Sequence, residues 1–230
     1  MAENGVPRQR APAPPRSVFV AVAALVIAFA GPAALLTRPA GAADHLDPPG
    51  RTDVGANSDI AADIADVFIW NTAATVTIAV TGAGPRDAGI PATYDRNVLT
   101  RYHISNAGNP ATDEFVIDVR FGRDGMGNWG VQFTGVPGAS GPMSGPVQTI
   151  LTDPSGAKAI AGLFDDPFFF DLIGFRATRA TGALQIRNDR NFFAGKNDTV
   201  YVAEFPRAAV ENGAFPITAW AETRRIAGAP

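Results

Sequence analysis

Carboxylates gather in two stretches of the chain, the first between residues 44 and 66 and the second between residues 165 and 171. The first stretch also contains one of the two histidines. Oxygen ligands at about 2.3–2.6 Å suit Ca²⁺, whereas carboxylates combined with an imidazole suit a transition metal. If the two stretches meet in the fold, they form one metal site. Its predicted ligands are His45, Asp47, Asp63, Asp66, Asp165 and Asp166.

His45 offers a second kind of metal site if the chain is cut after Ala42. The new N-terminus then reads Ala43-Asp44-His45. A free α-amine, two deprotonated backbone amides and the imidazole place four nitrogens in one plane, which suits Cu(II) or Ni(II). Cleavage one residue later removes this site. The predicted cofactor is therefore a divalent cation, either calcium at the carboxylates or copper or nickel at the mature N-terminus.

The same residues also have other interpretations. Asp166 followed by Pro167 is typical of a helix N-cap and first helical residue, and His45 reads equally as an ordinary polar residue. One alternative function is an extracytoplasmic hydrolase with a carboxylate pair, in which Asp165 or Asp166 is one member. Another is a structural cell-surface interaction domain, which predicts an exposed apolar patch and no convergent polar pocket.

Composition excludes several classes of protein. The chain has no cysteine, so disulfides, thiolate metal sites and cysteine nucleophiles are excluded. With only His45 and His103, a zinc site of three histidines within one chain is also excluded. The net charge is −3 without an extended Lys/Arg cluster, which predicts no nucleic-acid partner and favours a cation or a neutral ligand over phosphate. No catalytic motif is present, so a non-enzymatic role is favoured.

Residues 1–42 are typical of a secretory signal peptide. Three arginines precede an apolar run at residues 18–30, Pro32 interrupts it, and Ala40-Gly41-Ala42 supplies small residues for a cleavage site. The sequence therefore predicts export of residues 43–230 to the periplasm or the exterior, by the general secretory route. The alternative is an uncleaved segment, which would be the chain's one predicted membrane contact.

Short β-type segments recur through residues 43–230 and predict a single, mostly-β domain. Apolar runs separated by Gly, Pro, Asn and Asp favour an antiparallel β-sandwich or a barrel-like domain with few short helices. A short helix is expected at residues 153–164 and a single helical turn at residues 207–212. The predicted strands are residues 67–70, 75–80, 98–104, 115–121, 129–133, 147–151, 199–205 and 217–223.

Several of these segments together resemble a bacterial family known as domain of unknown function 4331. They are residues 44–49, 63–68, 94–99, 115–121, 165–171 and 202–206. The first stands where the family carries a Ser-His-Arg-Glu-Ala-Pro-like run, although Asp47 replaces the family's Glu, and Tyr201-Val202 replaces a frequent His. The resemblance implies an exported β-rich fold and brings no established activity. We therefore expect an exported, non-enzymatic binding module for a metal ion or another small ligand.

Overall fold

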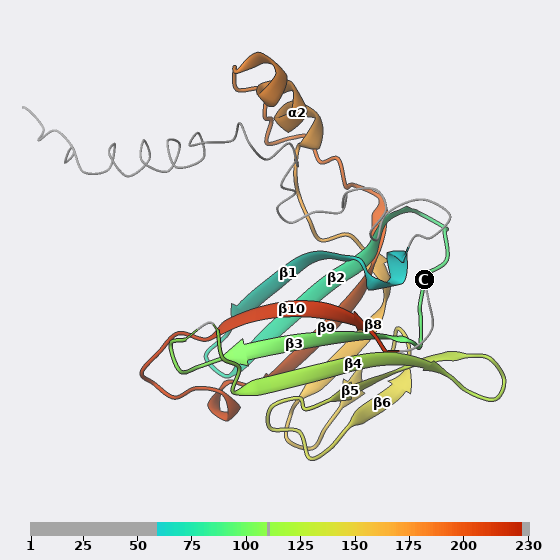
Figure 1. The fold of residues 1–230 in the computed structure, drawn as a ribbon, viewed down its shortest axis with the longest axis vertical. Helices are drawn as coiled ribbons and strands as arrows, with labels where there is room; N and C mark the ends of the chain where they lie inside the picture. Colours follow the sequence, from blue (N-terminus) through green and yellow to red (C-terminus); the bar gives the residue numbers. More distant parts are fainter. Residues whose placement is uncertain (1–58, 110, 227–230) are drawn as a thin grey trace, which may run out of the picture. The chain divides into compact units, whose positions relative to one another are not determined.

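Two antiparallel sheets of five strands each make up most of the described chain (Figure 1). This computed structural model describes residues 59–109 and 111–226, all of which belong to one compact unit, residues 41–230. The predicted mostly-β class and the sandwich-like arrangement are confirmed. Neither sheet closes on itself, so the barrel alternative is wrong.

Both sheets contain strands that are distant in sequence. Sheet A has the order β1-β2-β9-β8-β7 and sheet B the order β10-β3-β4-β5-β6, and every neighbouring pair is antiparallel. The strands of sheet A are β1 (Ile64–Asn71), β2 (Thr75–Asp87), β9 (Lys196–Pro206), β8 (Lys158–Asp165) and β7 (Leu151–Thr152). Those of sheet B are β10 (Thr218–Arg225), β3 (Val98–Ser105), β4 (Phe115–Arg123), β5 (Trp129–Thr134) and β6 (Met143–Pro146).

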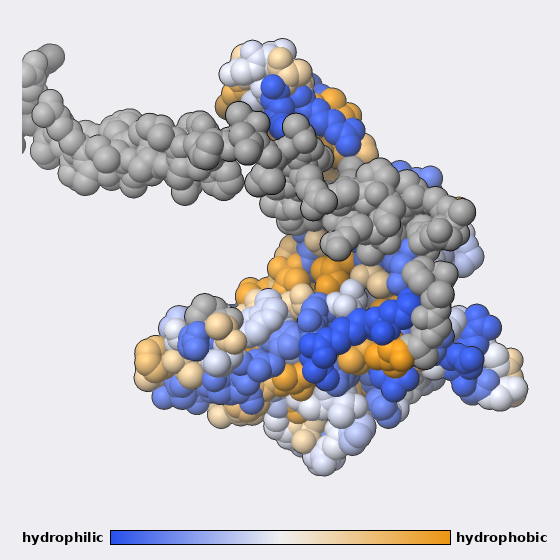
Figure 2. Space-filling view, viewed as in Figure 1, coloured by the Kyte–Doolittle hydropathy of each residue, from blue (hydrophilic) through white to orange (hydrophobic). Residues whose placement is uncertain are grey.

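Apolar side chains on the facing sides of the two sheets form the core. Ile78 and Phe205 of sheet A and Ile104 and Phe133 of sheet B are completely buried. Successive residues of a strand point to opposite faces, so the alternate positions carry polar side chains outward. Figure 2 shows the hydrophilic outer surface over β3 and β10. The fold thus follows from the period-two pattern of its strands.

One hydrogen bond crosses the core between the two sheets. The Tyr102 hydroxyl of β3 donates to the Tyr201 carbonyl oxygen of β9, 2.9 Å away. Both tyrosines are buried, and burial raises the pKa of both phenols, that of Tyr201 to about 12. The core therefore holds both phenols in their neutral form, because burial disfavours the phenolate.

Two predictions between residues 147 and 164 are wrong. The predicted strand 147–151 is mostly a turn between β6 and β7. The predicted helix 153–164 is a turn followed by β8, because the Asp153 carboxylate accepts the Ser155 amide N–H and Gly156 adopts a φ of 91°. Alanine favours a helix in isolation, but every second residue here enters the sheet interior, so packing overrides propensity. The buried alanines are Ala157, Ala159 and Ala161.

Residues 166–195 leave sheet A between β8 and β9 and form an excursion that we call the arm (Figure 1). Within the described residues it carries the one α-helix, α2 (Leu172–Thr181), which the sequence analysis did not predict. The helix N-cap is Asp171, whose carboxylate accepts the Gly174 N–H at 2.8 Å. The predicted N-cap, Asp166, instead accepts the N–H of the residue two positions later.

Two 3-10 turns complete the described elements. They are η1 (Ile60–Ala62), before β1, and η2 (Arg207–Ala209), which confirms the helical turn predicted at residues 207–212. Across residues 59–109 and 111–226, no helix has the length and apolarity that crossing a membrane requires. The predicted signal, residues 1–42, lies outside the described residues.

Candidate functional site

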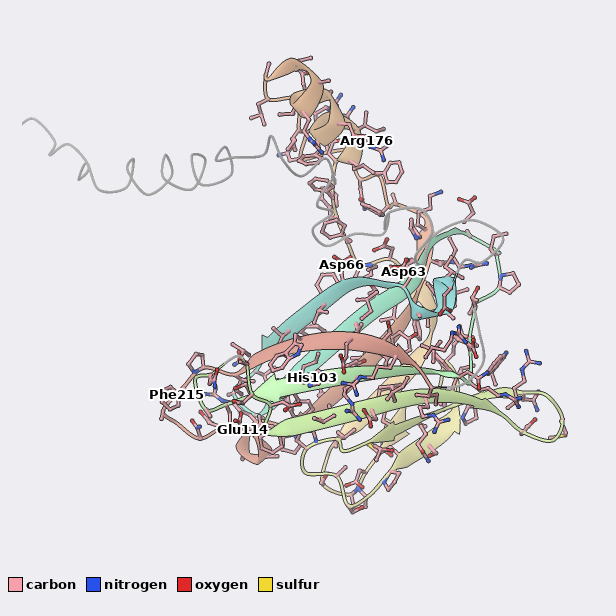
Figure 3. The ribbon with its side chains drawn as sticks, in the orientation of Figure 1. Asp63, Asp66, His103, Glu114, Arg176 and Phe215 are labelled. Carbon is pink, nitrogen blue, oxygen red and sulfur yellow. The ribbon has the colours of Figure 1, made fainter. Side chains whose placement is uncertain are left out.

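The four predicted metal ligands that the structure describes stand at one end of sheet A. Asp63 and Asp66 lie at the start of β1 (Figure 3), and Asp165 and Asp166 lie at the end of β8. The antiparallel register places the start of β1, the end of β2, the start of β9 and the end of β8 next to one another. The fold thus brings Asp63 and Asp66 to the same end of the sheet as Asp165 and Asp166.

These aspartates do not make a metal centre by themselves. Within the described part of the chain, no three His, Asp or Glu side chains are grouped so that they could hold a metal ion. Asp63 and Asp66 are buried, and the Asp66 N–H donates to the Thr81 hydroxyl at 3.1 Å. His45 and Asp47 lie outside the described residues, so a metal site that includes them stays a prediction.

His103 lies on the outer face of sheet B between two carboxylates (Figure 3). Its Nδ1 is 2.5 Å from Asp113 Oδ2, and its Nε2 is 3.2 Å from Glu222 Oε1. Its ring stacks on Trp220 with the centroids 4.9 Å apart, and its hydrogen bond lowers the pKa of Asp113. The Nδ1 contact with Asp113 and the stacking on Trp220 therefore tie the loop before β4 and β10 to His103 of β3.

A cleft of about 570 Å³ opens where the loop before β3 meets the β4–β5 hairpin. This volume falls in the range of small-molecule binding sites. Three arginines, Arg96, Arg120 and Arg123, and two aromatic residues, Tyr94 and Trp129, contribute to its lining. We call it the arginine cleft. Neither Asp165 nor Asp166 lines it, so it gives no support to the carboxylate-pair hydrolase.

The β4–β5 hairpin positions two of the three arginines. Arg120 points outward because the next residue, Phe121, points into the core. Arg123 pairs with Trp129 across the hairpin, and its guanidinium lies 4.2 Å from the centre of the Trp129 ring. The Asp124 carboxylate closes the turn by accepting backbone N–H groups, which fixes the ends of both strands.

Aromatic rings form the floor of the arginine cleft and rest on the core. The Tyr94 ring is 4.3 Å from that of Phe121 and 5.5 Å from that of Trp129. Phe121 continues inward to Tyr201, 5.5 Å away. Tyr94 is half-buried, and burial raises the pKa of its phenol. The floor is therefore a packed aromatic surface, and the Arg123 guanidinium lies over its Trp129 ring.

The arginine cleft carries net positive charge. Across the described residues, Arg96, Arg120 and Arg123 make no ion pair with a carboxylate. The acidic residue of the cleft, Asp95, is held by Arg225, whose Nη1 is 3.0 Å from Asp95 Oδ2. Burial opposes ionisation of Asp95, but hydrogen bonds from its surroundings win and lower its pKa. The expectation that the chain favours cations or neutral ligands stays a prediction, and the charge of this cleft favours an anion instead.

A second, more apolar cleft of about 450 Å³ lies beside the end of β1. It is lined by Ile69 and Trp70 of β1 and by Phe215, which precedes β10 (Figure 3). Arg207 and Glu211 pair at 2.5 Å in its lining. Since these two charges neutralise each other, this cleft lacks the excess charge of the arginine cleft.

Sequence reasoning missed the arginine cleft because its parts are far apart along the chain. Arg120 and Arg123 flank the end of a predicted strand, and Trp129 starts the next one, but nothing in the sequence places Arg96 beside them. The pairing of β3 with β4 brings the loop before β3 to the hairpin. Comparison of the chain with models of known families, with characterised proteins and with solved structures finds no match.

Proposed function

We propose that this chain is an exported, non-enzymatic binding module that takes a small anionic ligand into the arginine cleft. The observation that carries the proposal is the set of three arginines, without carboxylate partners among the described residues, around an aromatic floor. Guanidinium groups bind carboxylates and phosphates through paired N–H donors. The rings of Tyr94 and Trp129 offer stacking to the flat body of the same ligand. The ligand class is therefore a carboxylated ring compound, such as an acidic sugar or an aromatic acid.

Calorimetric titration of residues 43–230 tests this proposal. The probes are an oligogalacturonate, benzoate and the neutral analogue of each. We expect heat from an acidic probe and none from its neutral analogue, and we expect the affinity to fall as salt rises, because exposed charges are screened. Absence of heat from both acids would refute the proposal.

Two variants locate the binding site. Arg120→Gln removes one charge-assisted contact, each of which is worth about 1.5–3 kcal/mol, and should weaken binding at least tenfold. Arg176→Gln removes the same charge from the arm and serves as the matched control. Equal loss in both variants would show that the net charge of the chain, and not the cleft, attracts the probe.

A metal ion remains a second candidate ligand, favoured by the Ala43-Asp44-His45 sequence that cleavage after Ala42 would place at the N-terminus. Titration of residues 43–230 with Ca²⁺, Cu²⁺, Ni²⁺ and Zn²⁺ tests it directly. Heat that His45→Ala abolishes for Cu²⁺ or Ni²⁺ supports the site at the mature N-terminus. Neither heat nor a thermal shift with any of the four ions would refute the metal proposal.

Export is tested by the mass of the N-terminal peptide recovered from outside the cytoplasm. The proposed cleavage gives a peptide that starts at Ala43. A start at Asp44 keeps export but removes the planar copper or nickel site, because His45 becomes the second residue. Recovery of the intact chain from the cytoplasm would refute export.

A further inference from the structure

The arm concentrates exposed apolar side chains. Five large hydrophobic residues on it are more than a third exposed, and Leu184 reaches 79%. Figure 2 shows hydrophobic and hydrophilic side chains next to one another on the arm. Soluble monomers rarely expose such a concentration unless the surface contacts something else. The five residues are Phe169, Ile173, Phe175, Leu184 and Ile186.

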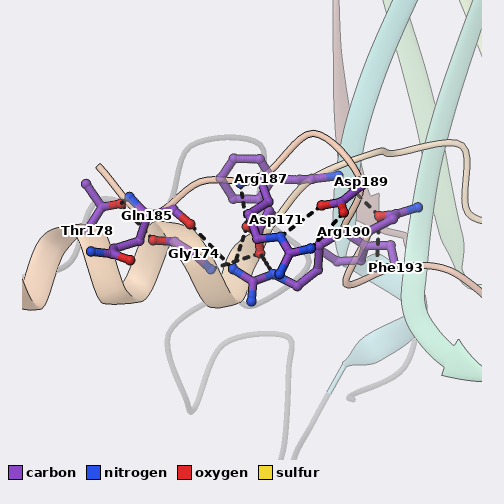
Figure 4. Close-up of polar contacts among 10 residues, drawn as sticks. Asp171, Gly174, Thr178, Gln185, Arg187, Asp189, Arg190 and Phe193 are labelled. Carbon is purple, nitrogen blue, oxygen red and sulfur yellow. Dashed lines mark hydrogen bonds and ion pairs between the residues drawn. The ribbon is translucent and has the colours of Figure 1, made fainter. Parts of the chain in front are cut away.

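These side chains belong to an ordered structure that holds itself together (Figure 4). The Asp171 carboxylate accepts hydrogen bonds from the backbone N–H groups of Gly174 and Arg187 and from the guanidinium of Arg190. The Thr178 hydroxyl accepts the N–H of Gln185 at 2.8 Å. The returning segment is thereby fastened to α2. The apolar residues are therefore presented at fixed positions and are not simply residues of a loose loop.

The charge of the arm is positive where its apolar residues are exposed. Asp171 pairs with Arg190 and Asp189 pairs with Arg187, so both acids within residues 171–190 are neutralised inside the arm. Arg176 and Arg179 make no ion pair with any described carboxylate.

Helical spacing places these cations among apolar residues. Ile173 and Arg176 are three residues apart on α2, and Arg176 and Ala180 are four apart, so all three share one face. The guanidinium of Arg179 lies 6.0 Å from the centre of the Phe175 ring. Of the described residues, none on the strands packs extensively against α2. This cationic and apolar face is thus available to a partner.

We propose that the arm binds the surface of an anionic lipid bilayer. Arg176 and Arg179 match the negative headgroups, while Ile173, Leu184 and Ile186 enter the boundary between headgroups and acyl chains. The rest of the domain is acidic, because residues 43–230 outside the arm contain 11 basic and 18 acidic residues. An anionic surface therefore attracts the arm and repels most of the remainder, the arginine cleft excepted, so that net charge favours an orientation with the arm toward the lipid.

Sedimentation with vesicles tests the proposal on residues 43–230. The vesicles are phosphatidylcholine alone or phosphatidylcholine with one third phosphatidylglycerol. We expect binding to the anionic vesicles and little to the neutral ones. Arg176→Gln with Arg179→Gln should weaken partitioning about 30-fold, since each arginine near an anionic surface contributes about 1 kcal/mol. The matched double variant Arg96→Gln with Arg120→Gln loses the same charge from the arginine cleft and should bind vesicles as the unchanged chain does.

A fluorescent label tests insertion independently of affinity. The chain has no cysteine, so Leu184→Cys creates one unique site for an environment-sensitive nitrobenzoxadiazole probe. We expect its emission to shift to the blue and brighten with anionic vesicles. The control is Ile150→Cys, whose parent side chain is 62% exposed between β6 and β7, and its probe should not respond.

Four outcomes would overturn the proposal. The first is absence of binding to anionic vesicles. The second is equal loss of binding in the arm and cleft double variants, which would assign the attraction to net charge alone. The third is a vesicle-bound protein whose probe at position 184 stays in water, which would place the contact elsewhere. Binding of soluble glycerophosphoglycerol as strongly as of vesicles would likewise assign the contact to the headgroup and not to a bilayer.

Discussion

The pair of buried tyrosines predicts a specific failure of the fold at alkaline pH. Tyr102 and Tyr201 are two of the chain's three tyrosines, and burial raises the pKa of both, that of Tyr201 to about 12. A phenol whose pKa is higher in the folded state stabilises the fold fully below the unfolded value of about 10. Its contribution is lost as the pH rises toward the folded value, because the unfolded chain releases its proton first.

The size of the loss follows from these shifts. Each phenol that stays protonated in the fold costs about 1.4 kcal/mol of unfolding free energy per pH unit above 10. From pH 10 to 12, Tyr201 therefore costs about 3 kcal/mol, and Tyr102, whose pKa is also raised well above its usual value, adds to this cost. Natural domains are stable by only about 5–15 kcal/mol, so a loss of this kind is a large share of the total. We expect cooperative unfolding as the pH approaches 12.

The substitution Tyr102→Phe should lower the stability of the fold at neutral pH and raise it near pH 12. At neutral pH the variant loses the hydrogen bond to the Tyr201 carbonyl oxygen and should be less stable by about 1 kcal/mol. At about pH 12 the variant has no phenol at position 102 that must stay protonated in the fold, so it should be more stable than the unchanged chain. The two stability curves must therefore cross between these conditions.

Urea unfolding followed by circular dichroism at steps of pH measures both curves. Tyrosinate absorbance, recorded in parallel, should rise for two tyrosines only as the circular dichroism signal is lost. Tyr94→Phe is the control, because Tyr94 is only half-buried. Ionisation of all three tyrosines near pH 10 with an unchanged fold, or parallel curves that never cross, would refute the reasoning.

Two further predictions concern turns and the arm. Gly135→Ala should lower the free energy of unfolding by about 2 kcal/mol or more, because the φ of Gly135 is 82° and a Cβ there would collide with the Val116 carbonyl oxygen. Chemical unfolding measures this loss. The control is Gly141→Ala, because a Cβ at Gly141 meets no other atom. Asp171→Asn should free the arm and speed its amide hydrogen exchange, whereas Asp189→Asn should not. Arg190 holds the pKa of Asp171 low, so the order of the arm in the unchanged chain should persist above about pH 4 and be lost only as the pH falls through that lowered value.

Most strands were predictable because their signals are local. The alternating run at 115–121 and the hairpin at 67–80 specify the side-chain faces and the turn within a few residues of sequence. The segment 153–164 was mispredicted because its alanines suit a helix unless a distant partner strand, β9, is present. Helix α2 was missed because its N-cap, Asp171, is held by Arg187 and Arg190. Both arginines follow the helix in sequence, and no local pattern links them to its start.

By itself, the sequence determined the class of the fold, the absence of thiol chemistry and the acidic character of residues 43–230. These are properties of composition and of period-two patterns, which do not depend on distant contacts. Only the tertiary structure decided that Arg96 joins Arg120 and Arg123 in one cleft, and that the pair Asp63 and Asp66 shares one end of sheet A with the pair Asp165 and Asp166. Such sites depend on strand order and register, which long-range packing selects, and a linear pattern does not encode them on its own.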